Sequence, residues 1–209
     1  MPQQSYSTTV TEIDLTTADG TMNCQVITPE RDGTLRAVIV YMPASGIRSE
    51  LVGIAERIAS AGHVVVLPNS FYRLARHVDI DARTVGGVGY CMGGRLAMAS
   101  AGAYPDRFAA AASLYGAGIV TDEYDSPHLR LGEVAGELYF GLAENDIYVS
   151  EEETAALKAH LPSIDVRHAV ETYPGTEHGF VFPERYCFSP EGAELHYQRL
   201  ADLFARTLG

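Results

Sequence analysis

A cysteine flanked by glycines is the first place in the sequence where chemistry is expected. Residues 89–93, GYCMG, follow a glycine- and valine-rich run and precede an alanine-rich run. The pattern Gly-x-nucleophile-x-Gly is typical of a sharp turn from strand to helix, where larger side chains at the glycine positions would collide with neighbouring backbone. The start of the helix favours a thiolate, and the N–H of Met92 would face a developing oxyanion. We therefore predict that Cys91 is a nucleophile; the alternative is a small, inert cysteine buried in a glycine-packed turn.

An acid and a base follow this cysteine in a suitable order. Glu144 and Asp146 come just beyond an apolar run, and His178 lies in a glycine-flanked loop beyond the next predicted strand. Loops at the carboxyl ends of parallel strands face the ligand, and in folds with such a turn the acid follows the nucleophile and the histidine comes last. Asp146 is predicted to orient His178, with Glu144 as its rival. His178 would take the proton of the Cys91 thiol and later activate water.

Strand-like and helix-like runs alternate along the chain. The segments on either side of Ala18-Asp19-Gly20 predict an antiparallel hairpin with an Asp-Gly turn. Later runs without polar alternation predict strands buried on both faces. This order implies a single α/β domain over residues 1–209, with a mostly parallel sheet covered by helices on both faces. The predicted strands after the hairpin are 37–43, 63–68, 85–90, 108–117, 136–142 and 165–174, and the predicted helices are 49–62, 95–104, 150–161 and 189–208.

Residues that begin and end helices support these assignments. Gly62 suits the position just past the first helix. Ser150 and Glu153 have the spacing of a capping box, and Ser189-Pro190 is typical of a helix start.

Composition narrows the range of functions. The net charge of −12 argues against binding to nucleic acid or to an anionic membrane, because phosphate contacts need a basic face. No apolar run reaches the roughly 18 residues of a membrane helix, and the N-terminus lacks the pattern of a secretory signal. Cys24, Cys91 and Cys187 are odd in number and have no metal-site spacing, which favours a reduced, cytoplasmic protein without a bound metal. Cys24 and Cys187 are expected to be structural.

Several longer stretches resemble the dienelactone hydrolase (carboxymethylenebutenolidase) family of the α/β-hydrolase fold. They are YMPASG at 41–46, FYR at 71–73, VGYCMGGRLA at 88–97, YFGLAENDIYV at 139–149 and YPGTEHGFVFPER at 173–185. The resemblance implies Cys91 as nucleophile, Asp146 rather than Glu144 as acid, and His178 as base. It also implies that Ala44 supplies the second oxyanion N–H. Family members hydrolyse lactones and small esters without metal or cofactor, so the expected partner is a small-molecule lactone or ester.

The sequence departs from the family pattern near the predicted pocket. Pro43 stands where the best-known members carry a carboxylate that helps to form the thiolate, so His178 is expected to activate the cysteine unaided. Arg73 matches one of two arginines that grip a substrate carboxylate, whereas Phe182 stands at the position of the second. The predicted substrate is therefore a lactone or ester in general. The residues predicted to contact it are Arg73, Tyr72, Tyr115 and Phe182.

The connection after Arg73 is short for this fold. Only 16 residues, 69–84, separate two predicted parallel strands, which predicts a stunted crossover and a more open pocket. Two other functions stay open from the sequence: a catalytically impaired hydrolase-fold protein that binds a ligand or partner, and a thiol enzyme that transfers acyl groups or cleaves peptides. The sequence is compatible with a monomer or a homodimer.

Overall fold

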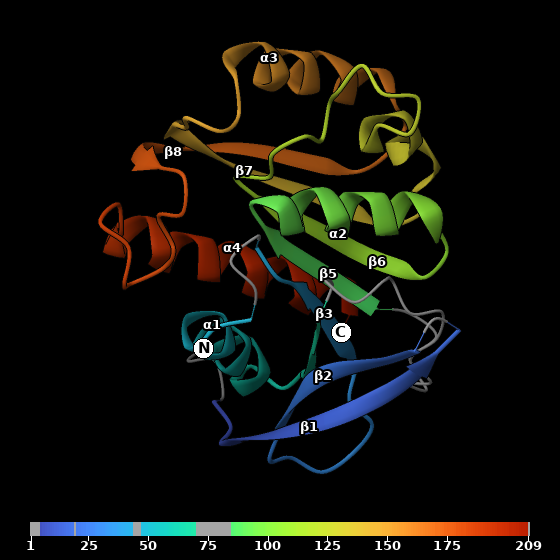
Figure 1. The fold of residues 1–209 in the computed structure, drawn as a ribbon, viewed down its shortest axis with the longest axis vertical. Helices are drawn as coiled ribbons and strands as arrows, with labels where there is room; N and C mark the ends of the chain where they lie inside the picture. Colours follow the sequence, from blue (N-terminus) through green and yellow to red (C-terminus); the bar gives the residue numbers. More distant parts are fainter. Residues whose placement is uncertain (1–4, 19, 44–46, 70–84, 209) are drawn as a thin grey trace.

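The computed structural model describes residues 5–18, 20–43, 47–69 and 85–208. They include one eight-stranded sheet in the order β1-β2-β4-β3-β5-β6-β7-β8. Strands β1 and β2 form an antiparallel hairpin, β2 also pairs antiparallel with β4, and the pairs from β4 through β8 are parallel. Figure 1 shows the hairpin at one end of the sheet and β7 and β8 at the other. The predicted α/β-hydrolase class and the N-terminal hairpin are confirmed.

The strands and helices follow the sequence patterns closely. The strands are β1 Thr8–Thr17, β2 Gly20–Pro29, β3 Ala37–Tyr41, β4 Val64–Pro68, β5 Val85–Tyr90, β6 Phe108–Leu114, β7 Glu137–Asn145 and β8 His168–Glu177. The α-helices are α1 Ser49–Ser60, α2 Met92–Ala103, α3 Glu151–His160 and α4 Pro190–Leu208, and the 3₁₀ helices are η1 Pro127–Glu133 and η2 Leu161–Ser163. The predicted shortened crossover after Arg73 lies outside the described residues.

Helices cover both faces of the sheet, as predicted. The apolar side chains of α1 and α4 share one core with inward residues of β3 and β5. The apolar side chains of α2, η1 and α3 form a second core with β6 and β7. The central strands are therefore buried on both sides, which explains why their sequences lack polar alternation. This rigid centre holds the carboxyl ends of β5, β7 and β8, where the predicted chemical groups lie.

The residues predicted to begin and end helices have one unexpected contact. Gly62 adopts φ +103° just past α1, and the Ser150 hydroxyl accepts from the N–H of Glu153 at 3.1 Å. The Glu153 carboxylate, however, accepts from the N–H groups of Ile119 and Val120 at 2.7 and 3.4 Å. It thus ties α3 to the segment after β6, a long-range role that the local capping-box spacing did not predict.

A buried hydrogen bond joins the last residue of β5 to α4. The Nδ1 atom of His196 donates to the carbonyl of Ala193 at 2.7 Å, so Nε2 accepts from the Tyr90 hydroxyl at 3.0 Å. His196 is fully buried. Burial, above all, lowers its pKa to about 4, so the imidazole is neutral in the fold at neutral pH. Because Tyr90 directly precedes Cys91, this pair anchors the turn that presents the cysteine.

This neutral histidine is expected to make the fold sensitive to acid. The unfolded chain takes up a proton on His196 near pH 6.5, whereas the folded chain resists until about pH 4. The free energy of unfolding should therefore fall as pH drops from 6.5 to 4, by at most about 3.5 kcal/mol at about 1.4 kcal/mol per pKa unit. Urea unfolding of the wild type and of His196→Gln at several pH values measures this slope. An equally steep fall in the variant would contradict the assignment to His196.

Candidate active site

The turn between β5 and α2 places Cys91 in a strained conformation. Cys91 has φ 56° and ψ −126°, a combination that few residues other than glycine adopt. Its N–H donates to the carbonyl of Leu114 at 3.1 Å, and its carbonyl accepts from the N–H of Gly94 at 2.9 Å. Backbone hydrogen bonds on both sides therefore hold the residue in this conformation. The predicted sharp turn from strand to helix, here called the elbow, is present.

Two glycines leave room for this turn. A Cβ atom on Gly89 would lie 1.8 Å from the carbonyl oxygen of Gly93. A Cβ on Gly93 would lie 2.5 Å from the carbonyl oxygen of Tyr41, at the end of β3. Both distances are far below van der Waals contact, so only glycine fits at either position. The register of β3 and β5, with Tyr41 opposite Gly89, brings the loop after β3 next to the same turn.

Asp146 and His178 meet at the adjacent strand ends. Asp146 directly follows β7, and His178 directly follows β8. The Nδ1 atom of His178 lies 2.9 and 2.8 Å from the two carboxylate oxygens of Asp146, and both side chains are only 6% exposed. One of these oxygens also accepts from the N–H groups of Tyr148 and Val149 at 2.8 and 3.1 Å. The carboxylate is therefore fixed by its own loop before it orients the imidazole.

Cys91 lies next to the other side of this imidazole. The Nε2 atom of His178 is buried, and the neighbour with which the imidazole interacts on this side is Cys91. Burial by itself lowers the pKa of His178, but hydrogen bonding and charge interactions with Asp146 and with Cys91 outweigh it. Together they raise the pKa to about 9. The imidazole is thus protonated at neutral pH, between a carboxylate and a sulfur that can carry negative charge.

Two tyrosines flank the imidazole, one buried and one exposed. The centroid of the Tyr115 ring lies 4.9 Å from that of His178, and the centroid of Tyr148 lies 4.7 Å from it. Tyr115 has φ 39°, and its buried hydroxyl has no partner among the described residues. Tyr148 is largely exposed. The sequence pointed to Tyr115 but missed Tyr148; an aromatic residue two positions after the predicted acid was the available signal.

The other predicted site residues have different placements. Met92 begins α2, so its N–H belongs to the first turn, where helical N–H groups have no carbonyl partner within the helix. Phe182 is 3% exposed and packs edge-on against Tyr90 with ring centroids 5.7 Å apart. The Glu144 carboxylate accepts from the N–H of Gly175 at 2.7 Å, whereas the His178 imidazole bonds to Asp146. The predicted residues Ala44, Tyr72 and Arg73 lie outside the described residues.

The sequence also matches a known protein family. Residues 73–208 match the dienelactone hydrolase family. The chain belongs to this family. A candidate carboxymethylenebutenolidase of Synechocystis sp. is 26% identical over 224 residues, which cover 86% of this chain and 89% of the relative.

Solved structures of related proteins share the fold of this dienelactone hydrolase family member. A candidate dienelactone hydrolase from Klebsiella pneumoniae superposes with a TM-score of 0.85 at 18% identity, covering 96% of this chain and 99% of that one. A hyperthermophilic esterase from Pyrobaculum calidifontis superposes with a TM-score of 0.76 at 20% identity, covering 98% of this chain and 88% of that one. The α/β-hydrolase fold predicted from the sequence is thus supported by the comparison with both.

Metal clusters and membrane-spanning helices are both absent from the described residues. No group of three or more His, Cys, Asp or Glu side chains there could hold a metal ion. No helix in the described part of the chain is long and apolar enough to cross a membrane.

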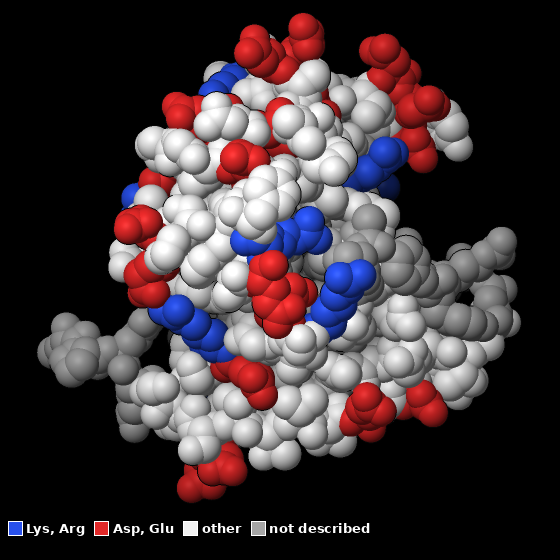
Figure 2. Space-filling model, turned by 60° about the vertical axis from the view of Figure 1, so that its left-hand side comes forward, with Lys and Arg blue, Asp and Glu red and all other residues white. Residues whose placement is uncertain are grey.

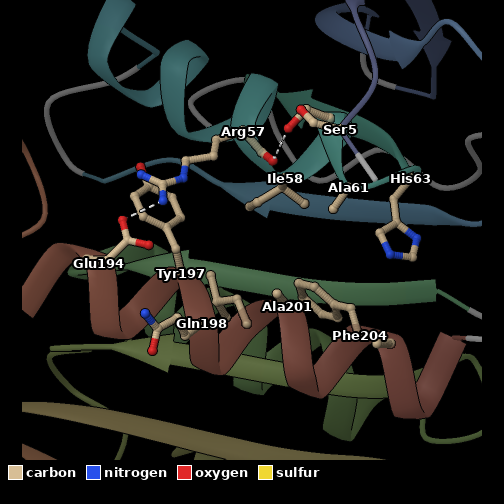
Figure 3. Close-up of a pocket in the computed structure, with 13 residues that line it drawn as sticks. Ser5, Arg57, Ile58, Ala61, His63, Glu194, Tyr197, Gln198, Ala201 and Phe204 are labelled. Atoms are coloured by element: carbon tan, nitrogen blue, oxygen red, sulfur yellow. Dashed lines mark hydrogen bonds and ion pairs between the residues drawn. The ribbon is translucent and has the colours of Figure 1, made fainter. Parts of the chain in front are cut away.

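A cavity of about 230 Å³ lies between α1 and α4 (Figure 3). Its apolar lining includes Ile58 and Phe204, and the Arg57–Glu194 ion pair lies at its rim. Neither Cys91, Asp146 nor His178 lines it, so this cavity is not where the predicted chemistry would occur.

The raised pKa of His178 is expected to make the fold less stable in mild alkali. In the folded chain the imidazole keeps its proton up to about pH 9, against about 6.5 when unfolded. This contribution is complete below pH 6.5 and is lost as pH rises through 9, so the free energy of unfolding should fall over that range. Its upper bound is about 3.5 kcal/mol at about 1.4 kcal/mol per pKa unit.

Urea unfolding between pH 6.5 and 9 measures this loss. Asp146→Asn, which removes the main charged partner of the imidazole, should show a shallower slope than the wild type. Parallel curves for the two proteins would show that the Asp146–His178 pair is not the source.

Proposed function

We propose that this protein hydrolyses lactones or small carboxylic esters, with Cys91 as nucleophile, His178 as base and Asp146 as the orienting acid. The observation that carries the proposal is the convergence of these groups. A cysteine at a positive-φ elbow lies beside an imidazole whose other nitrogen bonds a buried carboxylate. The order nucleophile, acid, histidine along the chain is that of α/β-hydrolases.

The acylation step uses the charge distribution around Cys91. In the resting site the proton of the Cys91 thiol is already held by His178, so a thiolate lies beside an imidazolium, and Asp146 balances the imidazolium charge. The thiolate attacks the substrate carbonyl carbon, and the carbonyl oxygen becomes an oxyanion. The N–H of Met92 would stabilise this oxyanion, with Ala44 proposed as the second donor. Pro43 has no carboxylate that could help to form the thiolate from that position. The raised pKa of His178 supports the proposal that this histidine holds the thiol proton unaided.

Collapse of the tetrahedral intermediate releases the alcohol. The C–O bond breaks, the imidazolium of His178 gives its proton to the leaving oxygen, and a thioester forms on Cys91. The neutral imidazole then removes a proton from a water molecule, and the hydroxide attacks the thioester carbonyl. The carboxylic acid leaves and the thiolate–imidazolium pair is restored, so that each turnover consumes one ester and one water molecule. In a lactone, the alcohol and the acid remain parts of one molecule.

Trapping the thioester tests this proposal directly. The protein is mixed with 4-nitrophenyl acetate, quenched in acid within the first turnovers, and digested for mass spectrometry. The peptide that contains Cys91 is expected to carry one acetyl group, and nitrophenol release should show a burst that matches the enzyme concentration. Acetylation of Cys24 or Cys187 in place of Cys91, or turnover without any thioester, would rule out the proposed mechanism.

A further inference from the structure

We propose that Ile147, Tyr148 and Tyr186, here called the rim, bind the alcohol part of the ester and make the enzyme selective for aromatic alcohols. This inference rests on the proposed function, because it assigns a substrate class to the same site. The rim lies on two loops, one after β7 and the other between β8 and α4.

The rim consists of large, exposed side chains on the two loops that contact His178. Ile147, Tyr148 and Tyr186 are 77%, 66% and 87% exposed. Both loops contact His178, one through the Tyr148 ring and the other through the Cys187 thiol, so the two loops approach each other. Figure 2 turns the side of the molecule with the β8–α4 loop toward the viewer and shows scattered acidic and basic side chains with uncharged surface between them. Exposed apolar groups gathered at one place on a soluble protein commonly mark a binding surface.

Hydrogen bonds fix both loops next to His178. The N–H of Tyr148 donates to the Asp146 carboxylate at 2.8 Å, which holds the start of the rim against the candidate acid. The thiol of Cys187, the residue after Tyr186, donates to the carbonyl of His178 at 3.2 Å. A loop held in this way loses little conformational entropy when a ligand binds to it.

The position of Tyr148 indicates which part of the substrate it contacts. Its ring centroid lies 4.7 Å from that of His178, with the planes inclined at 59°. In the proposed reaction His178 protonates the leaving oxygen, so the group attached to that oxygen must lie beside the imidazole. Tyr148 is the exposed ring next to that position, since the other flanking ring, Tyr115, is buried. An aromatic pair contributes about 0.5–1.5 kcal/mol beyond area burial, or about two- to tenfold in binding.

Three acetate esters with alkoxide leaving groups of similar basicity test the inference. Benzyl acetate carries an aromatic ring, cyclohexylmethyl acetate carries a saturated ring of similar size, and ethyl acetate carries neither. We measure kcat/KM for each with the wild type, Tyr148→Ala, Tyr148→Phe and Tyr104→Ala. Tyr104 is a matched control because it is also an exposed tyrosine but follows the far end of α2 from Cys91.

The expected result is a wild-type preference for benzyl over cyclohexylmethyl acetate that falls about two- to tenfold in Tyr148→Ala. Tyr148→Phe should keep the preference, because the ring and not the hydroxyl makes the contact, and Tyr104→Ala should keep it as well. The inference is overturned if Tyr148→Ala lowers all three esters equally, since that would mean a general effect on the imidazole. It is also overturned if Tyr104→Ala lowers the preference as much. Turnover of all three esters that depends on Cys91 but shows no aromatic preference would reject the rim while leaving the proposed function intact; turnover that does not depend on Cys91 would reject both.

Discussion

Replacing Cys91 with alanine is expected to lower kcat for activated esters on the order of 10⁴-fold or more, with the fold retained. Without the sulfur no thioester can form, and the remaining oxyanion donor and imidazole supply only a small part of the rate enhancement. Alanine fits because the side chain is smaller and the backbone is held by hydrogen bonds to Leu114 and Gly94. Release of 4-nitrophenol measures the rate, and circular dichroism with urea unfolding measures the fold.

Two companion variants sharpen this result. Cys24→Ala is the matched control, since Cys24 is buried in β2 and contacts the core at the hairpin end of the sheet. It should keep full turnover. Cys91→Gly should be as inactive as Cys91→Ala but more stable, because glycine adopts the φ of 56° without strain. Turnover at the wild-type rate in both Cys91 variants would favour a different nucleophile. Loss of turnover in Cys24→Ala would contradict the choice of Cys91.

Replacing Gly89 with alanine is expected to have the largest effect on stability. The added methyl group would lie 1.8 Å from the carbonyl oxygen of Gly93 and 2.1 Å from its carbonyl carbon. These are backbone atoms of α2, so the helix must move away from β5 or the turn must open. We expect little folded protein, or a loss of more than about 4 kcal/mol in the free energy of unfolding, in the range of the most severe single substitutions.

The chain offers a matched glycine for comparison. Gly53 lies inside α1, and a Cβ atom there would meet nothing within 4 Å. Gly53→Ala should therefore stabilise the protein by about 0.5–1 kcal/mol, the ordinary gain of alanine over glycine in a helix. Urea unfolding of both variants measures the difference. A Gly89→Ala protein that unfolds at the wild-type urea concentration would show that the turn is not as close as described.

The fold and the contact between His178 and Asp146 could be predicted from the sequence because the patterns that indicate them are local. Glycine spacing around Cys91 reports a steric limit within five residues, and apolar runs report strands buried on both faces. Chain order then places Asp146 and His178 at neighbouring strand ends, where the structure has them 2.8 Å apart. These inferences need only the connectivity of a parallel sheet.

Contacts between distant segments could not be read in the same way. The hydrogen bond from Tyr90 to His196 spans 106 residues, and Glu153 reaches back 34 residues to Ile119. Both depend on how α3 and α4 pack, which residue spacing along one element does not encode. Tyr148 was missed for a related reason: an exposed tyrosine in a loop gains meaning only when the imidazole beside it is known. Phe182 was expected to contact substrate; the structure shows it buried against Tyr90, a packing contact that its position in the motif did not predict, and its contact with substrate stays a prediction.

The ring beside His178 also offers an optical signal. The protein has 12 tyrosines and no tryptophan, so its ultraviolet emission comes from tyrosine without brighter indole emission over it. Tyr148 stands 4.7 Å from an imidazole that changes charge near pH 9. The difference in emission between the wild type and Tyr148→Phe would therefore follow the titration of that imidazole in solution, with no label attached.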